Sequence, residues 1–208
     1  MSKLKIWGRM SSINVKKVVW TAQELGLDFE RIEAGGVHGV VKTPEYLALN
    51  PNSQIPVMKD GEYVLWESNV ITRYLCARHS TGSVYPTDLQ QRFDAERWME
   101  WQQTTVNPAS RNGFWHLIRL PAEQGDPALV AQSNAAVEPL MAMLDAHLAH
   151  RRFMVGERFT MADIPLGCEV QRWLGLPQAR IARPNIERWF ASLLARPAAQ
   201  GVLDLPLA

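Results

Sequence analysis

A proline follows Ile55 where a strand is expected to begin, in the run Ser53-Gln54-Ile55-Pro56-Val57-Met58. Proline has no N–H to donate to a sheet, so it is normally confined to strand ends. A proline here often marks a cis bond, which turns the N–H and C=O of Ile55 toward a ligand. Glu67 and Ser68 follow a second expected strand and begin a helix, whose free N–H groups suit a carboxylate. Together the two segments predict a clamp for a small peptide-like ligand with an acidic end.

The composition narrows the class of protein. The 208 residues carry a net charge of +1, so the sequence lacks the excess of basic residues expected of a protein that binds nucleic acid or an anionic membrane. No apolar run approaches the ~18 residues needed to span a bilayer, and we expect no signal peptide. The two cysteines, Cys76 and Cys168, are far apart and lie in apolar helical contexts. We therefore expect a cytoplasmic protein without disulfides, with both cysteines buried as small hydrophobic residues.

The first eighty residues alternate strands and helices. A half-buried strand with Leu4 and Ile6 precedes a helix that ends at Gly26, and a strand from Phe29 to Ile32 follows in parallel. A short helix then begins at Pro44 and must stop by Asn50-Pro51. A hairpin follows, with strands over 55–59 and 63–66, and Ser68 is the expected N-cap of the next helix. This order (βαβ, α, ββα) describes a thioredoxin-like α/β domain over residues 1–80.

Beyond this domain the strand pattern disappears. Residues 81–88 are polar and turn-rich and read as a linker. Apolar residues then recur at helical spacing to the end of the chain. Thr160 to Asp163 resembles a capping box at a helix start, with Phe159 as its hydrophobic staple. Residues 89–208 are therefore expected to form an all-α bundle.

Four motifs in this order resemble the cytosolic glutathione S-transferase family over essentially the whole length. They are Ser12-Ile13-Asn14-Val15, Asn50-Pro51 leading to Ile55-Pro56, Glu67-Ser68-Asn69, and the run from Gly156 to Asp163. The likeness is to bacterial-type members with a serine and asparagine N-terminal motif, and it leaves the class open. It implies a detoxification enzyme that is usually a homodimer, with glutathione as co-substrate, a small hydrophobic electrophile as second substrate, and no metal.

The resemblance places the chemistry just after the first strand. A free thiol has a pKa near ~8.5, and each unit of depression needs about 1.4 kcal/mol of preferential stabilisation of the thiolate. Hydrogen bonds from a hydroxyl or amide at a helix start can supply this energy. The candidates are Ser11, Ser12 and Asn14, of which Ser12 and Asn14 correspond to positions that different classes use. Each could instead be a simple N-cap, which Ser and Asn favour.

The resemblance also implies the binding residues. The backbone of Ile55 before Pro56 would pair with the cysteinyl unit, and Glu67 and Ser68 would hold the γ-glutamyl amine and carboxylate. Three further side chains could reach the glycine carboxylate: Gln54, His38 and Lys42. Possible liners of the electrophile pocket are Met10, Asn107, Arg111, Trp115 and His116.

Departures from the family pattern leave alternatives open. No tyrosine ends the first strand and no cysteine lies near Ser12, which disfavours tyrosine-type and disulfide-forming classes. The same site could serve a glutathione-dependent peroxidase, dehalogenase or isomerase. A degenerate member could instead act as a non-catalytic ligand carrier or regulator.

Overall fold

The computed structural model describes residues 3–208 of the chain. The chain forms two compact units, and the division falls between Tyr85 and Pro86, inside the segment expected to be a linker. None of the helices in residues 3–208 combines the length and apolar character needed to cross a membrane. Each unit has its own elements and core, so each is described separately.

The first unit is built on a four-stranded sheet with the order β2-β1-β3-β4. The central strand β1 (Leu4–Trp7) runs parallel to β2 (Phe29–Ile32) and antiparallel to β3 (Val57–Asp60), which forms a hairpin with β4 (Tyr63–Trp66). In β1 the buried side chains of Leu4 and Ile6 alternate with exposed Lys5 and half-buried Trp7, as the sequence pattern predicts. The thioredoxin-like order of elements is therefore confirmed.

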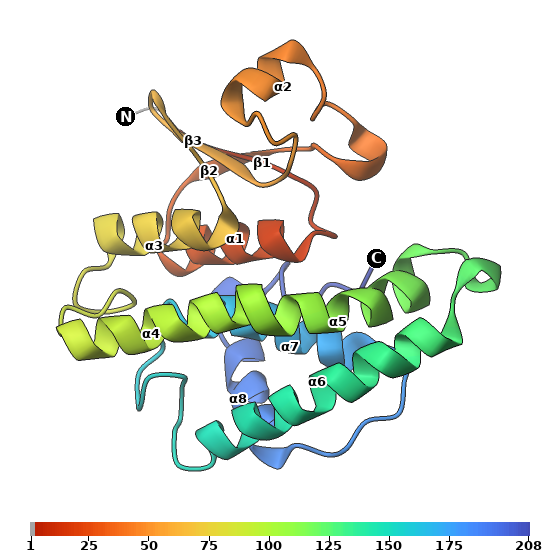
Figure 1. Cartoon of the computed structure of the whole chain (residues 1–208). Coiled ribbons are helices and arrows are strands. Elements are labelled where there is room, and N and C mark those ends of the chain that lie inside the picture. Colours follow the sequence, from red (N-terminus) through yellow and green to blue (C-terminus); the bar gives the residue numbers. More distant parts are fainter. Residues whose placement is uncertain (1–2) are drawn as a thin grey trace. The chain divides into compact units, whose positions relative to one another are not determined.

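Helices cover both faces of this sheet (Figure 1). The helices α1 (Ile13–Glu24) and α3 (Ser68–His79) pack against each other on one face, and α2 (Pro44–Leu49) covers the other. Tyr46 anchors α2, because its ring is buried in a cluster with Ala34 and Val57. A short turn of 3₁₀-helix, η1 (Gly36–His38), interrupts the loop after β2.

Two boundaries differ from the sequence expectation. The strand after the proline begins at Val57, because Pro56 has no N–H to donate to the sheet. The prediction that Ser68 caps α3 is wrong by one residue: Glu67 holds the N-cap position and Ser68 is the first helical residue. Ser68 is instead buried, with its hydroxyl turned toward Asn14.

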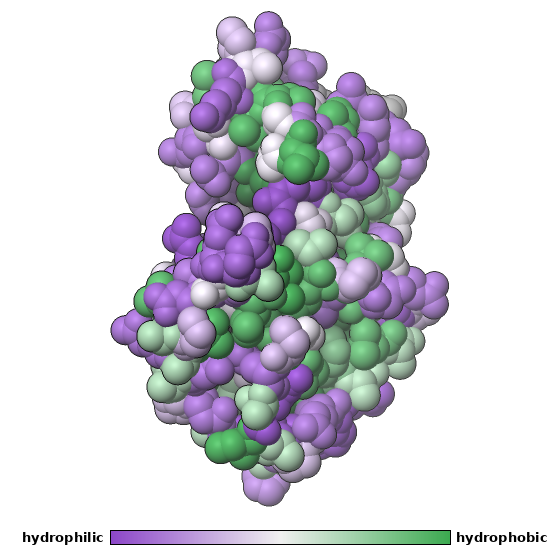
Figure 2. Space-filling view, turned by 90° about the vertical axis from the view of Figure 1, so that its right-hand side faces the viewer, coloured by the Kyte–Doolittle hydropathy of each residue, from purple (hydrophilic) through white to green (hydrophobic). Residues whose placement is uncertain are grey.

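The second unit is helical, as expected. A long helix runs through α4 (Leu89–Trp101), the π-helical turn η2 (Gln102–Val106), α5 (Asn107–Phe114) and a second π-helical turn, η3 (Trp115–Arg119). A 3₁₀ turn, η4 (Ala122–Gln124), leads into α6 (Pro127–Leu148), which packs against α5 and α8 (Pro184–Leu194). The helix α7 (Asp163–Gly175) is buried from Asp163 to Trp173 and contacts α8. The 3₁₀ turn η5 (Pro197–Ala199) follows α8 near the end of the chain. One face of the protein, with its hydrophilic and hydrophobic residues, is shown in Figure 2.

Both cysteines are buried and reduced, which confirms the sequence expectation. Cys76 lies in α3, and Cys168 lies in α7. Burial raises the pKa of the Cys76 thiol to about 12, with a further contribution from the negative charge of Glu24. The Cys76 thiol is therefore kept protonated and shielded from solvent.

Candidate functional site

The loop between β1 and α1 holds the predicted catalytic residues. Ser12 is the N-cap of α1, with extended backbone angles (φ −90°, ψ 123°), but its side chain makes no capping hydrogen bond. The fold therefore does not use the Ser12 hydroxyl as a cap. The first turn of α1 contains no acidic residue, so its partial positive charge is not offset by a carboxylate of that turn.

Asn14 lies beside a residue predicted to bind the γ-glutamyl group. The Ser68 hydroxyl donates to Asn14 Oδ1 at 3.3 Å, across 54 residues of sequence. This contact joins the start of α1 to the start of α3. Because Oδ1 faces Ser68, the amide group of Asn14 has its two N–H donors on the other side of the side chain.

The peptide bond between Ile55 and Pro56 is cis, as the sequence predicts. The carbonyl of Gln54, the preceding residue, accepts two hydrogen bonds, from the Tyr46 hydroxyl (2.8 Å) and from Asn50 Nδ2 (2.9 Å). These two donors fix the segment that leads into the cis bond. Burial raises the pKa of the Tyr46 hydroxyl to about 12, so this group donates as a neutral phenol.

Glu67 adopts a left-handed backbone conformation, with a φ of 73°. A non-glycine residue pays of order 1 kcal/mol or more for such a conformation, and such residues cluster at ligand sites. The Glu67 side chain is exposed, whereas Ser68 and Asn69 behind it are buried. The exposed carboxylate at a strained turn fits the predicted partner of an ammonium group.

The remaining predicted binding residues lie outside this cluster of contacts. His38 is exposed in η1 and its Nε2 lies 3.5 Å from a Glu33 carboxylate oxygen. Lys42 and the Gln54 side chain are exposed to solvent. For these three residues the structure shows accessible positions on the first unit.

The predicted pocket liners divide between the two units. Met10 is half-buried in the loop before α1. Asn107, Arg111 and Trp115 are spaced four residues apart along the long helix, which places them on one face. Asn107 Oδ1 accepts a hydrogen bond from Arg172 at 2.9 Å, and Trp115 is 45% exposed. His116 lines a cavity of about 380 Å³ between η3 and the start of α6, and its Nδ1 accepts from the N–H of Asp126.

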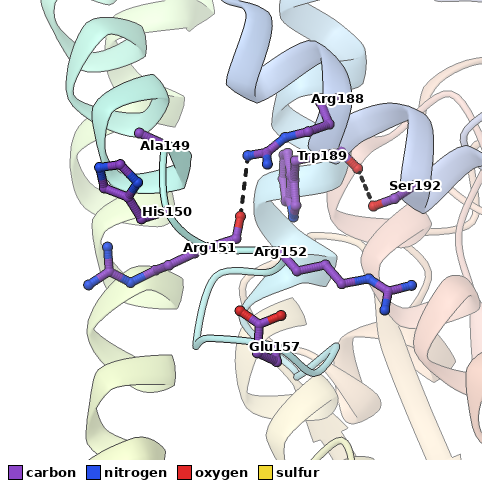
Figure 3. Close-up of a pocket in the computed structure, with 8 residues that line it drawn as sticks. All are labelled: Ala149, His150, Arg151, Arg152, Glu157, Arg188, Trp189 and Ser192. Carbon is purple, nitrogen blue, oxygen red and sulfur yellow. Dashed lines mark hydrogen bonds between the residues drawn. The ribbon is translucent and has the colours of Figure 1, made fainter.

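Another cavity of about 380 Å³ lies in the second unit, at the C-terminal end of α6 (Figure 3). It is rich in arginine, but the charged ends of Arg151 and Arg152 point away from each other. Arg188 donates to the carbonyls of Leu148 and Arg151, and so caps the end of α6. The cations therefore do not converge on one point, and the cavity contains none of the residues predicted from the sequence.

Sequence reasoning missed several residues that shape the site. Tyr46 supports the segment before the cis bond, yet its position in a short helix reads only as a core residue. Arg9 donates to the Ser11 hydroxyl at 2.5 Å, a contact that no motif in the sequence indicates. No group of three or more His, Cys, Asp or Glu side chains in residues 3–208 is arranged to hold a metal ion.

Two family models match the chain. Residues 2–77 match "Glutathione S-transferase, N-terminal domain" and residues 106–197 match "Glutathione S-transferase, C-terminal domain". Glutathione S-transferase GstB of Escherichia coli (strain K12) is 36% identical, and the alignment covers 98% of this chain and 99% of that protein. Glutathione S-transferase 3 of Zea mays is 32% identical over 100% of this chain and 96% of its own length.

A solved structure supports the same relationship. It is the theta class glutathione S-transferase from the citrus canker pathogen Xanthomonas axonopodis pv. citri with glutathione bound. The two chains superpose with a TM-score of 0.96, are 40% identical and cover each other over 100% of their lengths. The likeness therefore extends over both units.

Proposed function

The chain belongs to the glutathione S-transferase family and is a glutathione transferase, and from this premise we propose that the start of α1 activates the thiol of glutathione. The observation that carries this proposal is the Ser12 hydroxyl, which stands at a helix N-terminus without serving as a cap. A thiolate there would accept a hydrogen bond from Ser12 and would face the positive end of the helix. The activated sulfur would then attack a small hydrophobic electrophile.

The neighbouring residues have complementary roles in this proposal. Asn14 would donate a second hydrogen bond to the sulfur, since Ser68 holds the carbonyl end of its amide. The backbone of Ile55, with Gln54 and Pro56 on either side, would pair with the cysteinyl unit. Glu67 would bind the γ-glutamyl ammonium, and Ser68 with the N–H groups of α3 would bind its carboxylate. His38 and Lys42 would be available to the glycine carboxylate of glutathione.

The second substrate belongs to the helical unit in this proposal. Asn107, Arg111 and Trp115 present a row of polar and aromatic groups on one helix face. An exposed indole beside an arginine suits a flat hydrophobic electrophile with a polar leaving group. The Arg172 hydrogen bond fixes Asn107 in this row.

We also propose a homodimer in the cytoplasm. Large apolar side chains are exposed at the end of β4 and the start of α3 (Trp66, Val70), and others are exposed on α4 (Leu89, Phe93). Burying such residues in an interface between two copies would remove apolar area from water.

The test is the thiolate absorbance of glutathione bound to the purified protein, titrated with pH. Wild-type protein should form the thiolate well below the pKa of the free thiol. Ser12→Ala should raise the pKa of bound glutathione by about 1 to 2 units, because a charge-assisted hydrogen bond contributes about 1.5–3 kcal/mol. The affinity for glutathione should stay within a few-fold of wild type, since the glutamyl and glycyl contacts remain.

Two comparison variants assign the donor. Ser11→Ala tests the neighbouring hydroxyl, and Asn14→Leu tests the amide. An unchanged pKa and turnover in Ser12→Ala would move the assignment to one of these residues. Wild-type protein that binds glutathione with the pKa of the free thiol would contradict activation at this helix start.

A further inference from the structure

Arg9 has a fixed position in the loop before α1. The backbone N–H of Arg9 donates to the carbonyl of Ala34 at 3.2 Å, and the backbone carbonyl of Arg9 accepts from the N–H of Ser12 at 3.1 Å. Its side chain is half-buried, and Nη1 donates to Ser11 Oγ at 2.5 Å. The guanidinium group therefore lies next to the proposed site of thiol activation.

Gly36 provides the surface on which the Arg9 side chain lies. A β carbon built at Gly36 would stand 2.7 Å from Arg9 Nε, 3.1 Å from Cδ and 3.2 Å from Cζ. Only the absence of a side chain at Gly36 leaves room for this contact. Arg9 Nε is buried there and has no hydrogen-bond partner among residues 3–208.

The charge of Arg9 is not compensated by a carboxylate. Arg31 of β2 and His38 of η1 both lie within ion-pair distance of Glu33. In the part of the chain that the structure describes, no Asp or Glu oxygen lies within 4.0 Å of an Arg9 nitrogen. The remaining charged groups predicted at the site are the exposed side chains of Lys42 and Glu67, and α1 contributes no acidic residue in its first turn.

We propose that Arg9 is a positioning residue for thiol activation: held against Gly36, its guanidinium orients the Ser11 hydroxyl and adds an uncompensated positive charge beside the bound sulfur. Because Ser11 Oγ accepts from Arg9, the guanidinium fixes the place of this hydroxyl in the loop directly before Ser12. A nearby cation favours the ionised form of a thiol. This proposal rests on the proposed function and adds a residue that acts on the same sulfur.

The first test compares Arg9→Lys and Arg9→Met with wild type by titrating the thiolate absorbance of bound glutathione. Arg9→Met should raise the pKa of bound glutathione by about one unit, and Arg9→Lys, which keeps the charge, should raise it less. Binding of S-methylglutathione, which has no ionisable thiol, should stay within about two-fold of wild type in both variants. A pKa that is unchanged in Arg9→Met, or equal losses of S-methylglutathione affinity in both variants, would overturn the proposal.

The second test displaces the Arg9 side chain by a substitution at Gly36 and leaves Arg9 itself unchanged. Gly36 and Gly39 share a φ of +59°, but a β carbon at Gly39 would meet nothing within 4 Å. Both Gly36→Ala and Gly39→Ala therefore place alanine at the same φ, and only Gly36→Ala displaces the guanidinium. Gly36→Ala should raise the pKa of bound glutathione, whereas Gly39→Ala should not.

The combined variant completes the test. Gly36→Ala in the Arg9→Met background should cause no further rise in the pKa, because the group that it displaces is gone. Equal shifts in Gly36→Ala and Gly39→Ala would contradict the role of Arg9. A wild-type protein that titrates like free glutathione would instead show that the proposed function itself fails.

Discussion

At the scale of single residues, the proposed site consists of side chains that make few contacts needed for the fold itself. Ser12 occupies a capping position without capping, and Glu67 holds a left-handed conformation at an exposed turn. Asn14 is oriented by Ser68 from another helix. None of these three arrangements is explained by the local secondary structure alone. Such departures are expected where a bound ligand supplies the hydrogen-bond partner of a side chain.

Tyr46 gives a prediction at this scale. Tyr46→Phe removes the hydroxyl that donates to the Gln54 carbonyl and should weaken glutathione binding several-fold, because the segment before Pro56 is less firmly held. It should lower the free energy of unfolding by about 1 kcal/mol, since Asn50 still donates to the same carbonyl. Calorimetry and urea denaturation would measure the two effects.

The matched control is Tyr63→Phe, which removes a hydroxyl from a tyrosine that is 49% exposed in the same unit. It should leave both glutathione binding and stability close to wild type. Equal effects of the two changes would show that the hydroxyl of Tyr46 does not support the site.

At the scale of elements, a buried polar network holds the helical unit together. Glu169 of α7 is 1% exposed and accepts from Gln102 of η2 at 2.7 Å and from Ser110 of α5 at 2.6 Å. Arg172 lies 3.5 Å from the same carboxylate and also donates to Asn107. The π-helical turn η2 shifts the register of the long helix where Gln102 meets Glu169, as such turns often do at functional positions.

Removing the cation from this network should be costly. Arg172→Met leaves the Glu169 charge buried without its ion-pair partner and should destabilise the protein by roughly 2 to 4 kcal/mol. Adding Glu169→Gln to Arg172→Met should recover at least about 1 kcal/mol of this loss, because the carboxylate charge is then gone. Urea denaturation of both single variants and the double variant measures this coupling.

The control for this change is Arg119→Met. Arg119 also lies over the Phe114 ring, at 5.1 Å, but is half-buried, whereas Arg172 lies over it at 4.6 Å and is 8% exposed. The control should cost well under 1 kcal/mol. A similar loss in both variants would assign the effect to aromatic contact rather than to Glu169.

Elements were easier to predict from the sequence than the contacts between them. The alternation in β1 and the helical spacing in α1 depend on near neighbours, so their places were predictable. Ser68 was misplaced because serine ordinarily favours the N-cap, whereas here Asn14, 54 residues away, holds its hydroxyl in the helix. The contact of Arg9 with Gly36 joins two loops, and no local pattern predicts which side chain will lie on a given glycine.

At the scale of the whole molecule, one buried acid affects global stability. Asp163, fully buried at the start of α7, accepts hydrogen bonds from Met154 N, Thr160 N and Trp189 Nε1, each at 2.9 Å. It thus joins α7 to α8 and to the preceding loop, as the expected capping role implies. Burial raises the pKa of the Asp163 carboxyl to about 6, and the hydrogen bonds only partly offset this rise.

The pH dependence of unfolding follows from this shift. In the unfolded chain the Asp163 pKa is about 3.9, so between about pH 4 and pH 6 only the folded state holds the proton. The contribution of Asp163 to stability is therefore fully present below about pH 4 and falls as the pH rises to about 6, by roughly 2 to 3 kcal/mol. Asp163→Asn should be less stable than wild type at every pH, because an amide cannot accept all three bonds.

The difference between wild type and Asp163→Asn isolates this group from other titrations. The free-energy difference from urea denaturation should be largest at pH 4 and should shrink by pH 7. A difference that is constant across this range, or that grows with pH, would show that Asp163 is ionised in the folded protein throughout.

The burial of both cysteines has a consequence if the second substrate is an alkylating electrophile, as we propose. The only two sulfhydryl groups of the chain are enclosed in α3 and α7, and the one in α3 is held as a neutral thiol. In the proposed function, an alkylating electrophile would meet the thiol of bound glutathione but neither thiol of the folded chain. Burial therefore protects the thiols of the protein from alkylation by its own substrate. Labelling of Cys76 or Cys168 by iodoacetamide would report the fraction of molecules that have unfolded.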